Sequence, residues 1–559
     1  MKHLLALALP LALAAAVPPA RAASPAPAAT APQPAPDAAG RDGLLAAQPG
    51  EPVLFPRLLG LRFLASPDQL ASPGWPADGV DASRVPLLDP AGIRLVMVPF
   101  MKAPASDASL QRLTEVVRAY LRFHGRPFTS VYLPPQDVTG GYVQVVVAEA
   151  RSAGEVTVSG AKHFSAASYR AVIRQKSGAP IDTAQAASDI AWLNRNPYRH
   201  AELSAEPGRD AGTTHLILLT QERLPLSLNA GYSNTGTALT DEDRVSAGLT
   251  WGDAFGRGDL LTLGVNGDPA WEHLRGYNAG YTAFLPWRHI LSLQGAYSDI
   301  TSTMPAPFAQ HGTSWQVGAR YEIPLAAPRP GWTQDLSFTA DFKYSDNTLE
   351  FAAVPITGNV THVIQAGASY GLTFPALGGR NSVRLEAVAS PGGLSDRNDD
   401  AAFAGSRPGA KADYAYARLG LRHQHALGAG WGLTLSADSQ FATGALLGSE
   451  QLNGGGSSAV RGYDESSAFG DWGVVGSAEL HLPPLRAARL RATADPFVFF
   501  DAASLNDHRA DSTEPRSLGV GVNLQVLSRL SVNFAYGWQL KDIGDGTNSR
   551  GHISVNVAW

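Results

Sequence analysis

From about residue 226 to residue 559, polar and apolar residues alternate along the chain. In 530–540 the even positions hold Leu, Val, Phe, Tyr, Trp and Leu, and the odd positions between them hold Ser, Asn, Ala, Gly and Gln. Segments 336–344 and 551–559 show the same period of two. Because successive side chains of a strand point to opposite faces of a sheet, each segment has one apolar face and one polar face. Alternation over roughly nine to eleven residues, rich in aromatic residues, predicts strands that cross a membrane.

Sixteen such segments follow one another, and the connections between them alternate in length. Short connections include 286–288 and 528–529, whereas 390–413 and 441–471 are long. This alternation is typical of outer-membrane barrels, which have short periplasmic turns and long outer loops. A soluble β-sandwich is the alternative, but its strands are usually shorter. The pattern therefore predicts a membrane β-barrel of 16 antiparallel strands over residues 224–559, whose closure leaves no backbone group unpaired in lipid.

The residues before the barrel predict two small α+β domains, at 57–150 and 151–223. In each domain a strand is followed by one or two helices and then by two more strands, so the order of elements repeats. Apolar residues spaced three and four apart predict the helices. The expected elements are a helix at 110–124 and strands at 128–133 and 141–149 in the first domain, and strands at 155–159, 199–205 and 213–220 with helices at 165–175 and 183–196 in the second.

The first 56 residues predict an exported chain. Lys2 and His3 precede an apolar run at 4–17, and Ala20-Arg21-Ala22 has the pattern of a cleavage site. This layout predicts a signal peptide at 1–22, because the apolar run is shorter than the roughly 20 residues of a membrane-spanning helix. Residues 23–56 are rich in proline and alanine, a composition that favours an extended linker.

Composition narrows the function classes. Charged residues make up 17% of the chain, and no basic cluster marks a nucleic-acid partner. The chain has 0 cysteines, which excludes disulfides and thiolate metal sites. The sequence contains no H-E-x-x-H, no G-x-S-x-G and no phosphate-binding G-x-x-x-x-G-K-[ST], so neither an enzyme nor a bound cofactor is expected.

The long connection 441–471 contains a glycine-rich stretch with the tetrad Val460, Arg461, Gly462 and Tyr463. By itself such a stretch is usually a loop in solvent, since glycine and serine clusters mark loops. By the alternation of short and long connections, this loop lies on the outer side of the barrel.

Segment 491–501 offers the loop a partner of opposite charge. Its polar members Arg491, Thr493 and Asp495 occupy odd positions, so the odd positions are expected to face the lumen. Phe499 and Asp501 share that parity. An inward carboxylate is as readily solvated as paired, and the residues alone leave both possibilities open.

Taken together, these features resemble the two-partner secretion transporters, the haemolysin secretion/activation family. They are the signal peptide, the two α+β domains, the sixteen strands, the VRGY tetrad before the twelfth strand and an F-x-D motif at 499–501 in the thirteenth. The sequence YLPPQDVTGGYVQVVVAEA at 132–150 is similar to the end of that family's first polypeptide-transport-associated (POTRA) domain. The resemblance covers residues 57–559.

The resemblance implies that the loop folds back into the barrel and that Arg461 pairs with Asp501. Gly462 then allows close backbone approach, with Tyr463 and Phe499 packed beside the pair. It also implies a location in the bacterial outer membrane, with the POTRA domains in the periplasm. Many relatives carry an N-terminal helix that plugs the pore, but the only helix-like stretch before the first domain here is 41–48.

The implied function is translocation of a large partner exoprotein from the periplasm to the cell surface. The expected partners are the unfolded exoprotein, bound by the POTRA domains, outer-membrane lipid, and the periplasmic chaperones and barrel assembly machinery that insert the chain itself. One alternative is an assembly or insertion factor of the same superfamily, which usually has more POTRA domains. Another is a porin or an adhesin-type barrel, which needs no such domains. The sequence does not indicate whether the cargo is a haemolysin, an adhesin or a toxin.

Overall fold

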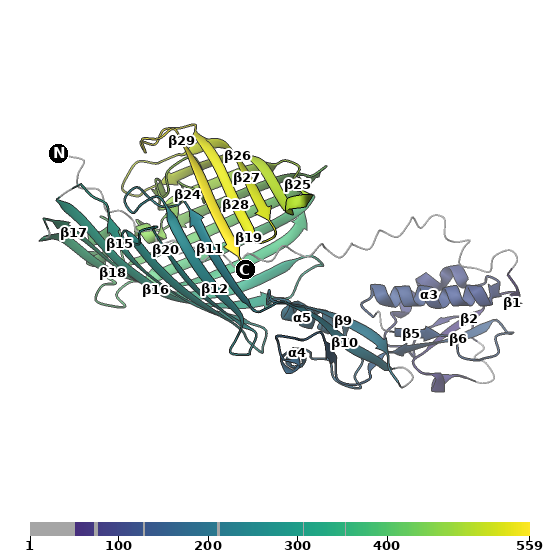
Figure 1. Cartoon of the computed structure of the whole chain (residues 1–559). Helices are drawn as coiled ribbons and strands as arrows, with labels where there is room; N and C mark the ends of the chain where they lie inside the picture. Colours follow the sequence, from purple (N-terminus) through teal and green to yellow (C-terminus); the bar gives the residue numbers. More distant parts are fainter. Residues whose placement is uncertain (1–50, 72–76, 127–128, 210–212, 306, 353) are drawn as a thin grey trace. The chain divides into compact units, whose positions relative to one another are not determined.

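The computed structural model describes residues 51–71, 77–126, 129–209, 213–305, 307–352 and 354–559 (Figure 1). The chain separates into two compact units, with the division between Arg223 and Leu224. The predicted signal peptide at 1–22, the linker up to residue 50 and the helix-like stretch 41–48 lie outside the described residues. In the described ranges, no helix is long and apolar enough to cross a membrane.

The first α+β domain has a four-stranded sheet in the order β3-β2-β6-β5, with two helices packed on it. Ser106 starts the long helix α3, because its hydroxyl accepts a hydrogen bond from the backbone N–H of Ser109 in a capping box. The predicted helix at 110–124 is confirmed, beginning three residues earlier. The elements are β1 Val53–Phe55, β2 Gly60–Leu64, β3 Gly79–Asp81, α2 Pro90–Met97, β4 Ala105–Ser106, α3 Asp107–Phe123, β5 Thr129–Tyr132 and β6 Tyr142–Glu149.

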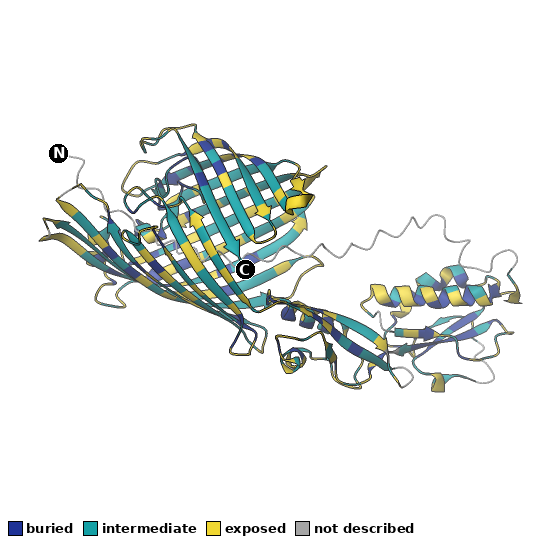
Figure 2. Ribbon diagram, viewed as in Figure 1, coloured by how far each residue is buried: buried dark blue, intermediate teal, exposed yellow. Residues whose placement is uncertain are grey.

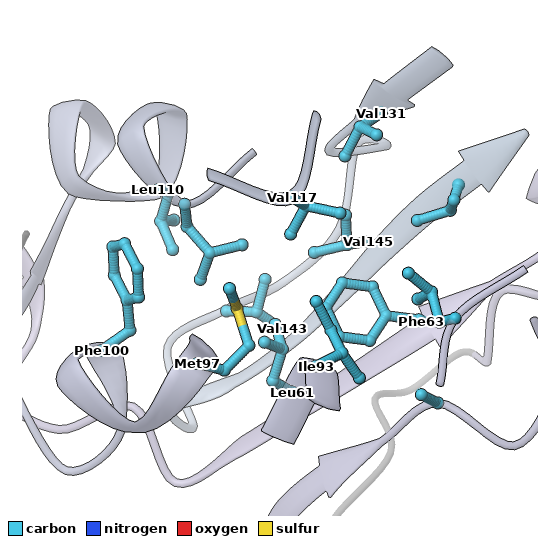
Figure 3. Close-up of a cluster of buried hydrophobic side chains, with 14 of the residues drawn as sticks. Leu61, Phe63, Ile93, Met97, Phe100, Leu110, Val117, Val131, Val143 and Val145 are labelled. Carbon is cyan, nitrogen blue, oxygen red and sulfur yellow. The ribbon is translucent and has the colours of Figure 1, made fainter. Parts of the chain in front are cut away.

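The core of this domain lies between the helices and the sheet. Leu110 and Val117 of α3 face Val143 and Val145 of β6, and Phe63 of β2 lies beside them (Figure 3). All five side chains are buried. Burial of apolar residues spaced three or four apart on a helix against a strand rich in valine is what the sequence pattern requires.

The second α+β domain is built around β10, which pairs with β9 on one side and with β7 and β8 on the other. Glu222 at the end of β10 accepts hydrogen bonds from the Tyr169 hydroxyl (2.6 Å) and the backbone N–H of Lys162 (2.8 Å). Burial alone would raise the pKa of Glu222, but these hydrogen bonds lower it below its usual value. The elements are β7 Arg151–Ser152, β8 Thr157–Ser159, α4 Ala166–Val172, α5 Thr183–Leu193, β9 Arg199–Pro207 and β10 Thr213–Glu222.

Residues from Leu226 to Ala558 form a closed antiparallel barrel of 16 long strands, as predicted. A short strand, β25 Leu485–Ala487, adds to β26 at one end of the barrel. The barrel strands are β11 Leu226–Ser233, β12 Arg244–Ala254, β13 Asp259–Gly267, β14 Leu274–Phe284, β15 Ile290–Ser302, β16 Phe308–Leu325, β17 Thr333–Phe351, β18 Val354–Ala376, β19 Gly379–Pro391, β20 Asp413–Gly428, β21 Trp431–Ala442, β24 Trp472–His481, β26 Ala492–Asn506, β27 Arg516–Val526, β28 Leu530–Gln539 and β29 Ser549–Ala558.

Burial alternates along the barrel strands (Figure 2). In β26, Val498 and Phe500 are 39% and 44% exposed, whereas Phe499 and Asp501 are buried. The odd positions of β26 therefore face the lumen, as the alternation predicts. Arg491 is an exception, because β26 begins after it and its backbone is left-handed (φ 46°), so Arg491 belongs to the turn rather than to the lumen wall.

Eight barrel strands are longer than the nine to eleven residues expected from the sequence, and the longest are β16, β17 and β18. β16, β17 and β18 have 18, 19 and 23 residues. Their pairing continues to the strand ends, since Phe308 pairs with Phe351 and Phe351 with Val354. The ladder of hydrogen bonds satisfies backbone groups beyond the membrane as well as within it, so the strands extend where the sequence pattern predicts loop.

Candidate functional site: a loop held inside the barrel

The connection between β21 and β24, residues 443–471 and here called the motif loop, is a hairpin with its own ladder. β22 Leu452–Asn453 pairs with β23 Phe469–Gly470, and the N–H of Gly454 donates to the carbonyl of Ala468 (2.9 Å). Nearer the tip, the N–H of Ser457 donates to the Glu465 carboxylate (2.7 Å). The hairpin therefore presents residues 460–463 at its tip as a defined structure.

Arg461 at the tip lies between two lumen-facing carboxylates. Its guanidinium donates to both oxygens of Asp501, from Nε at 2.7 Å and from Nη2 at 2.8 Å, and Nη1 donates to Glu479 at 2.6 Å. The guanidinium also lies 3.7 Å from the ring centroid of Phe499. Paired contacts to one carboxylate fix the orientation of an arginine as well as its position. Cation–π stacking adds a further contact.

Gly462 brings the loop backbone against the wall. Its φ is +92°, and a Cβ at this position would lie 2.8 Å from the carbonyl carbon of Gly537 in β28. Conversely, a Cβ at Gly537 would lie 2.8 Å from the nitrogen of Gly462. The Gly462 carbonyl accepts from Gln539 (3.0 Å), and its N–H donates to Nε2 of His552 (3.3 Å). Two glycines, one on each side, are therefore required for this contact.

Val460 and Tyr463 are fully buried and form a small apolar cluster with Ala503 and Leu505 of β26. The Tyr463 hydroxyl accepts from the N–H of Arg516 (2.9 Å) and lies within hydrogen-bonding distance of two backbone carbonyls. All six residues singled out in the sequence, Val460, Arg461, Gly462, Tyr463, Phe499 and Asp501, thus lie in one site.

A second contact, which the sequence did not indicate, holds the descending arm of the motif loop. Glu450 is buried and accepts from Nζ of Lys343 in β17 (2.6 Å) and from the hydroxyl of Tyr416 in β20 (3.0 Å). Its backbone carbonyl accepts from Arg418 (3.1 Å) and Gln440 (3.0 Å). Lys343 is a polar odd position of the alternating segment 336–344, but no periodicity in the loop points to Glu450.

A third contact joins the base of the motif loop to two neighbouring loops. Arg407 follows the short helix α6 Asp400–Ser406 and donates to Asp471 (2.6 and 3.0 Å) and to Asp507 (2.6 Å). Asp471, which is fully buried, also accepts from the N–H of Leu446 (2.9 Å) and of His508 (2.9 Å). Three connections are therefore tied to one another where the motif loop enters the barrel.

The site holds a segment of chain in place and contains no arrangement suited to covalent chemistry. Its charged side chains form ion pairs with one another. In the part of the chain that the structure describes, no three His, Cys, Asp or Glu side chains are grouped closely enough to hold a metal ion. The contacts begin at β17 with Lys343 and end at β29 with His552.

A closed transmembrane barrel with a loop held in its lumen, preceded by α+β domains, defines an outer-membrane transporter of the POTRA and barrel class. The family model described as haemolysin secretion/activation protein ShlB/FhaC/HecB matches residues 212–526, and the ShlB-type POTRA domain matches residues 75–150. The chain belongs to the haemolysin secretion/activation family, whose members are outer-membrane transporters and not enzymes. The predicted family and the outer-membrane location, with POTRA domains in the periplasm, are confirmed.

Individual proteins resemble the chain in sequence or in fold. The outer membrane transporter CdiB of Dickeya dadantii (strain 3937) is 23% identical over 464 residues, which cover 77% of this chain and 76% of the relative. The structure of CdiB from Escherichia coli aligns with a TM-score of 0.72 at 17% identity, over 94% of this chain and 93% of that one. BamA from Haemophilus ducreyi, lacking POTRA domains 1–3, aligns with a TM-score of 0.52 at 15% identity, over 83% and 96%. At these identities the structural likenesses concern the fold alone.

Proposed function

We propose that this chain translocates a large, unfolded partner exoprotein from the periplasm through its barrel to the cell surface. The observation that carries the proposal is the motif loop, which is held at its tip, its descending arm and its base inside a barrel of the two-partner secretion family. A sixteen-stranded barrel encloses an aqueous lumen unless something fills it. A loop held so specifically supports control of a passage rather than passive diffusion.

In this proposal Arg461 and Asp501 form a positional latch. Both groups lose hydration when they pair, so the pair is a weak source of net stability. Loss of one partner, by contrast, leaves a charge uncompensated in a buried place, since Asp501 is fully buried. The pair therefore favours one loop position over all others. Gly462, Gly537 and Tyr463 sharpen that preference through close contact.

The POTRA domains supply the proposed binding site for the unfolded cargo. β9 has nine residues and pairs with β10 along one side, and no described strand pairs with its other side. Such an edge can accept an extended peptide as an additional strand, with main-chain hydrogen bonds giving affinity for many sequences. The edge is already occupied at Ala201, where the side chain of Asn194 bonds both the N–H and the carbonyl. A cargo strand would therefore have to pair elsewhere along β9 or displace Asn194.

Folding of the cargo gives transport its direction in this proposal. An outer membrane offers no nucleotide, whereas an exoprotein that folds repeat by repeat outside the cell draws the rest of the chain through. Periplasmic chaperones and the barrel assembly machinery are the proposed partners for insertion of the transporter itself.

The second candidate function is assembly of other outer-membrane proteins, which the likeness of fold to BamA favours. Deletion of the gene separates the two, with mass spectrometry of the culture medium and of the outer membrane as the measurement. We expect one large exoprotein to disappear from the medium while the membrane barrels stay at normal abundance. General loss of barrels from the outer membrane would overturn secretion in favour of assembly.

A further inference from the structure

The polar lining of the lumen differs between two parts of the barrel wall. Residues that pair directly across neighbouring strands face the same side of the barrel, so the lumen-facing positions can be followed from strand to strand. From Phe497 they run through Gly521 and Ala535 to His552 in β29. Asn556 of β29 faces the same side as His552 and pairs with Gly231 in β11. On β11 to β15, all of whose residues are described, the inward positions are mainly serine, threonine, asparagine, glutamine, glycine and alanine. We call this surface the neutral wall.

The neutral wall carries one charged inward residue. Arg244 lies at the first position of β12 and donates to the carbonyls of Thr240 (3.0 Å), Asp241 (2.9 Å) and Asp243 (2.8 Å) in its own turn. Its charge therefore interacts with the backbone carbonyls of the neighbouring turn. The remaining inward positions of these five strands offer hydroxyl and amide groups without a formal charge.

The neutral wall is also shallow. At three residue pairs, one between β11 and β12 and two between β13 and β14, an inward asparagine lies directly opposite a glycine, and its amide lies across the place where a Cβ would stand. A Cβ would approach the asparagine Oδ1 to 2.6 Å at Gly248 (opposite Asn229), 2.5 Å at Gly264 (opposite Asn278) and 2.4 Å at Gly276 (opposite Asn266).

β16 separates the neutral wall from the strands β17 to β29, which have the opposite character and which we call the charged wall. Inward positions there include Lys343, Arg418, Glu479 and Asp501, each of which is hydrogen-bonded to the motif loop. Among the residues that the structure describes, the hydrogen bonds and ion pairs from the motif loop to barrel strands all end on strands between β17 and β29. The loop is therefore attached to strands of the range β17 to β29, and its described hydrogen bonds and ion pairs leave β11 to β15 without such a contact.

We propose that the exoprotein crosses the barrel as an extended chain along the neutral wall, while the motif loop keeps its contacts with the charged wall. The inference rests on the proposed secretion function and adds the path that the cargo takes. Opposite charges about 4 Å apart attract one another even in water, so a charged wall retards some cargo segments more than others. Hydroxyl and amide groups bond any backbone alike, and a shallow surface lets side chains of every size pass.

Single-cysteine crosslinking tests the path, because the chain has no cysteine of its own. The two matched variants are Asn278→Cys on β14 of the neutral wall and Asn523→Cys on β27 of the charged wall. Both positions are inward asparagines. The probe is the exoprotein that disappears from the medium on gene deletion, carrying one cysteine and a fused, rapidly folding domain that stalls it in the barrel. Disulfide formation with the stalled cargo is measured on non-reducing gels.

We expect the Asn278→Cys variant to capture the stalled cargo about tenfold more efficiently than the Asn523→Cys variant, a ratio that corresponds to about 1.4 kcal/mol of preference. Equal capture at both positions, or stronger capture at Asn523, would overturn the path. Secretion by each variant before stalling is the control for folding. If deletion of the gene removes no exoprotein from the medium, the proposed function itself fails, a result distinct from capture on the wrong wall.

Discussion

The two walls of the lumen share one strand alternation but use it differently. On the charged wall, inward side chains bind one partner, the motif loop. The single residue Arg461 of that loop contacts Asp501, Glu479 and Phe499. On the neutral wall, inward side chains match no partner in particular, and asparagine amides lie across the Cβ positions of facing glycines. The comparison shows how one barrel can hold its own loop specifically and still offer a passage that tolerates many sequences.

The physical basis of the difference is the strength and direction of the polar contacts. A charge-assisted hydrogen bond is roughly twice as strong as a neutral one, and a two-point contact between arginine and carboxylate also fixes geometry. Neutral hydrogen bonds exchange readily with those of water, at a small net change in free energy. Strong, directed contacts suit a segment that stays in place, and weak, interchangeable contacts suit one that passes.

The largest effect is expected from breaking the latch on the charged wall. Arg461→Asp leaves the carboxylate of Asp501 buried without its partner, a loss of about 3 to 5 kcal/mol for a buried pair, and secretion should fall strongly. Secretion by the Asp501→Arg variant should fall by a similar amount. Pulse-chase of the secreted exoprotein measures both.

The reversed pair, Arg461→Asp with Asp501→Arg, should recover part of the secretion lost in the single variants. Recovery should be incomplete because Glu479 then faces a second acidic side chain, and adding Glu479→Gln should increase it. If neither reversal improves on the single variants, the guanidinium and carboxylate do not act as a pair.

A smaller effect is expected where the loop backbone touches the wall. Gly537→Val places methyl groups where the Gly462 backbone lies, and overpacking of this kind costs about 1 to 3 kcal/mol. The tip should be displaced, and single-channel conductance in planar bilayers should change. Gly476→Val is the matched control, since a Cβ there meets its nearest neighbour at 3.5 Å. Unchanged conductance in the Gly537 variant would argue against close glycine contact.

The smallest effect is expected from a single charge on the neutral wall. Ser292→Asp on β15 should slow an exoprotein variant that carries a lysine-rich segment by about fivefold, the factor that corresponds to about 1 kcal/mol. Ser436→Asp on β21 is the matched change on the charged wall and should alter the rate little. The half-time of cargo appearance in the medium measures both, and equal slowing by the two substitutions would remove the distinction between the walls.

The sequence predicts the barrel well because its determinant is local. Each crossing strand alternates polar and apolar residues, so strand number and the inward direction of Asp501 can be read directly from the chain. The ends of the strands are harder to predict from the sequence, because β16 to β18 are extended by pairing with one another. Arg491 was misplaced for a related reason, since a left-handed turn ends the alternation there.

The contacts of the motif loop were only partly predictable. Arg461 and Gly462 stand in a recognisable motif, whereas Glu450, Arg407 and Asp471 are isolated charges in irregular segments, where no period links position to direction. Their partners lie on strands and loops distant in the sequence, and only the closed barrel brings them together. Gly537 is similar, because one glycine among many has no local feature that marks it as the place where another backbone arrives.

A disulfide that fixes the motif loop to the charged wall tests the account most directly. A Cβ at Gly454 would lie 3.5 Å from the Cβ of Ala503 on β26, within the range of natural disulfides. The double variant Gly454→Cys with Ala503→Cys, in a chain without other cysteines, should lock the loop once oxidised. We predict that the locked transporter still secretes its exoprotein at nearly the rate of the reduced form. Loss of secretion on oxidation, restored by a reductant, would contradict a path along the neutral wall with the loop in place.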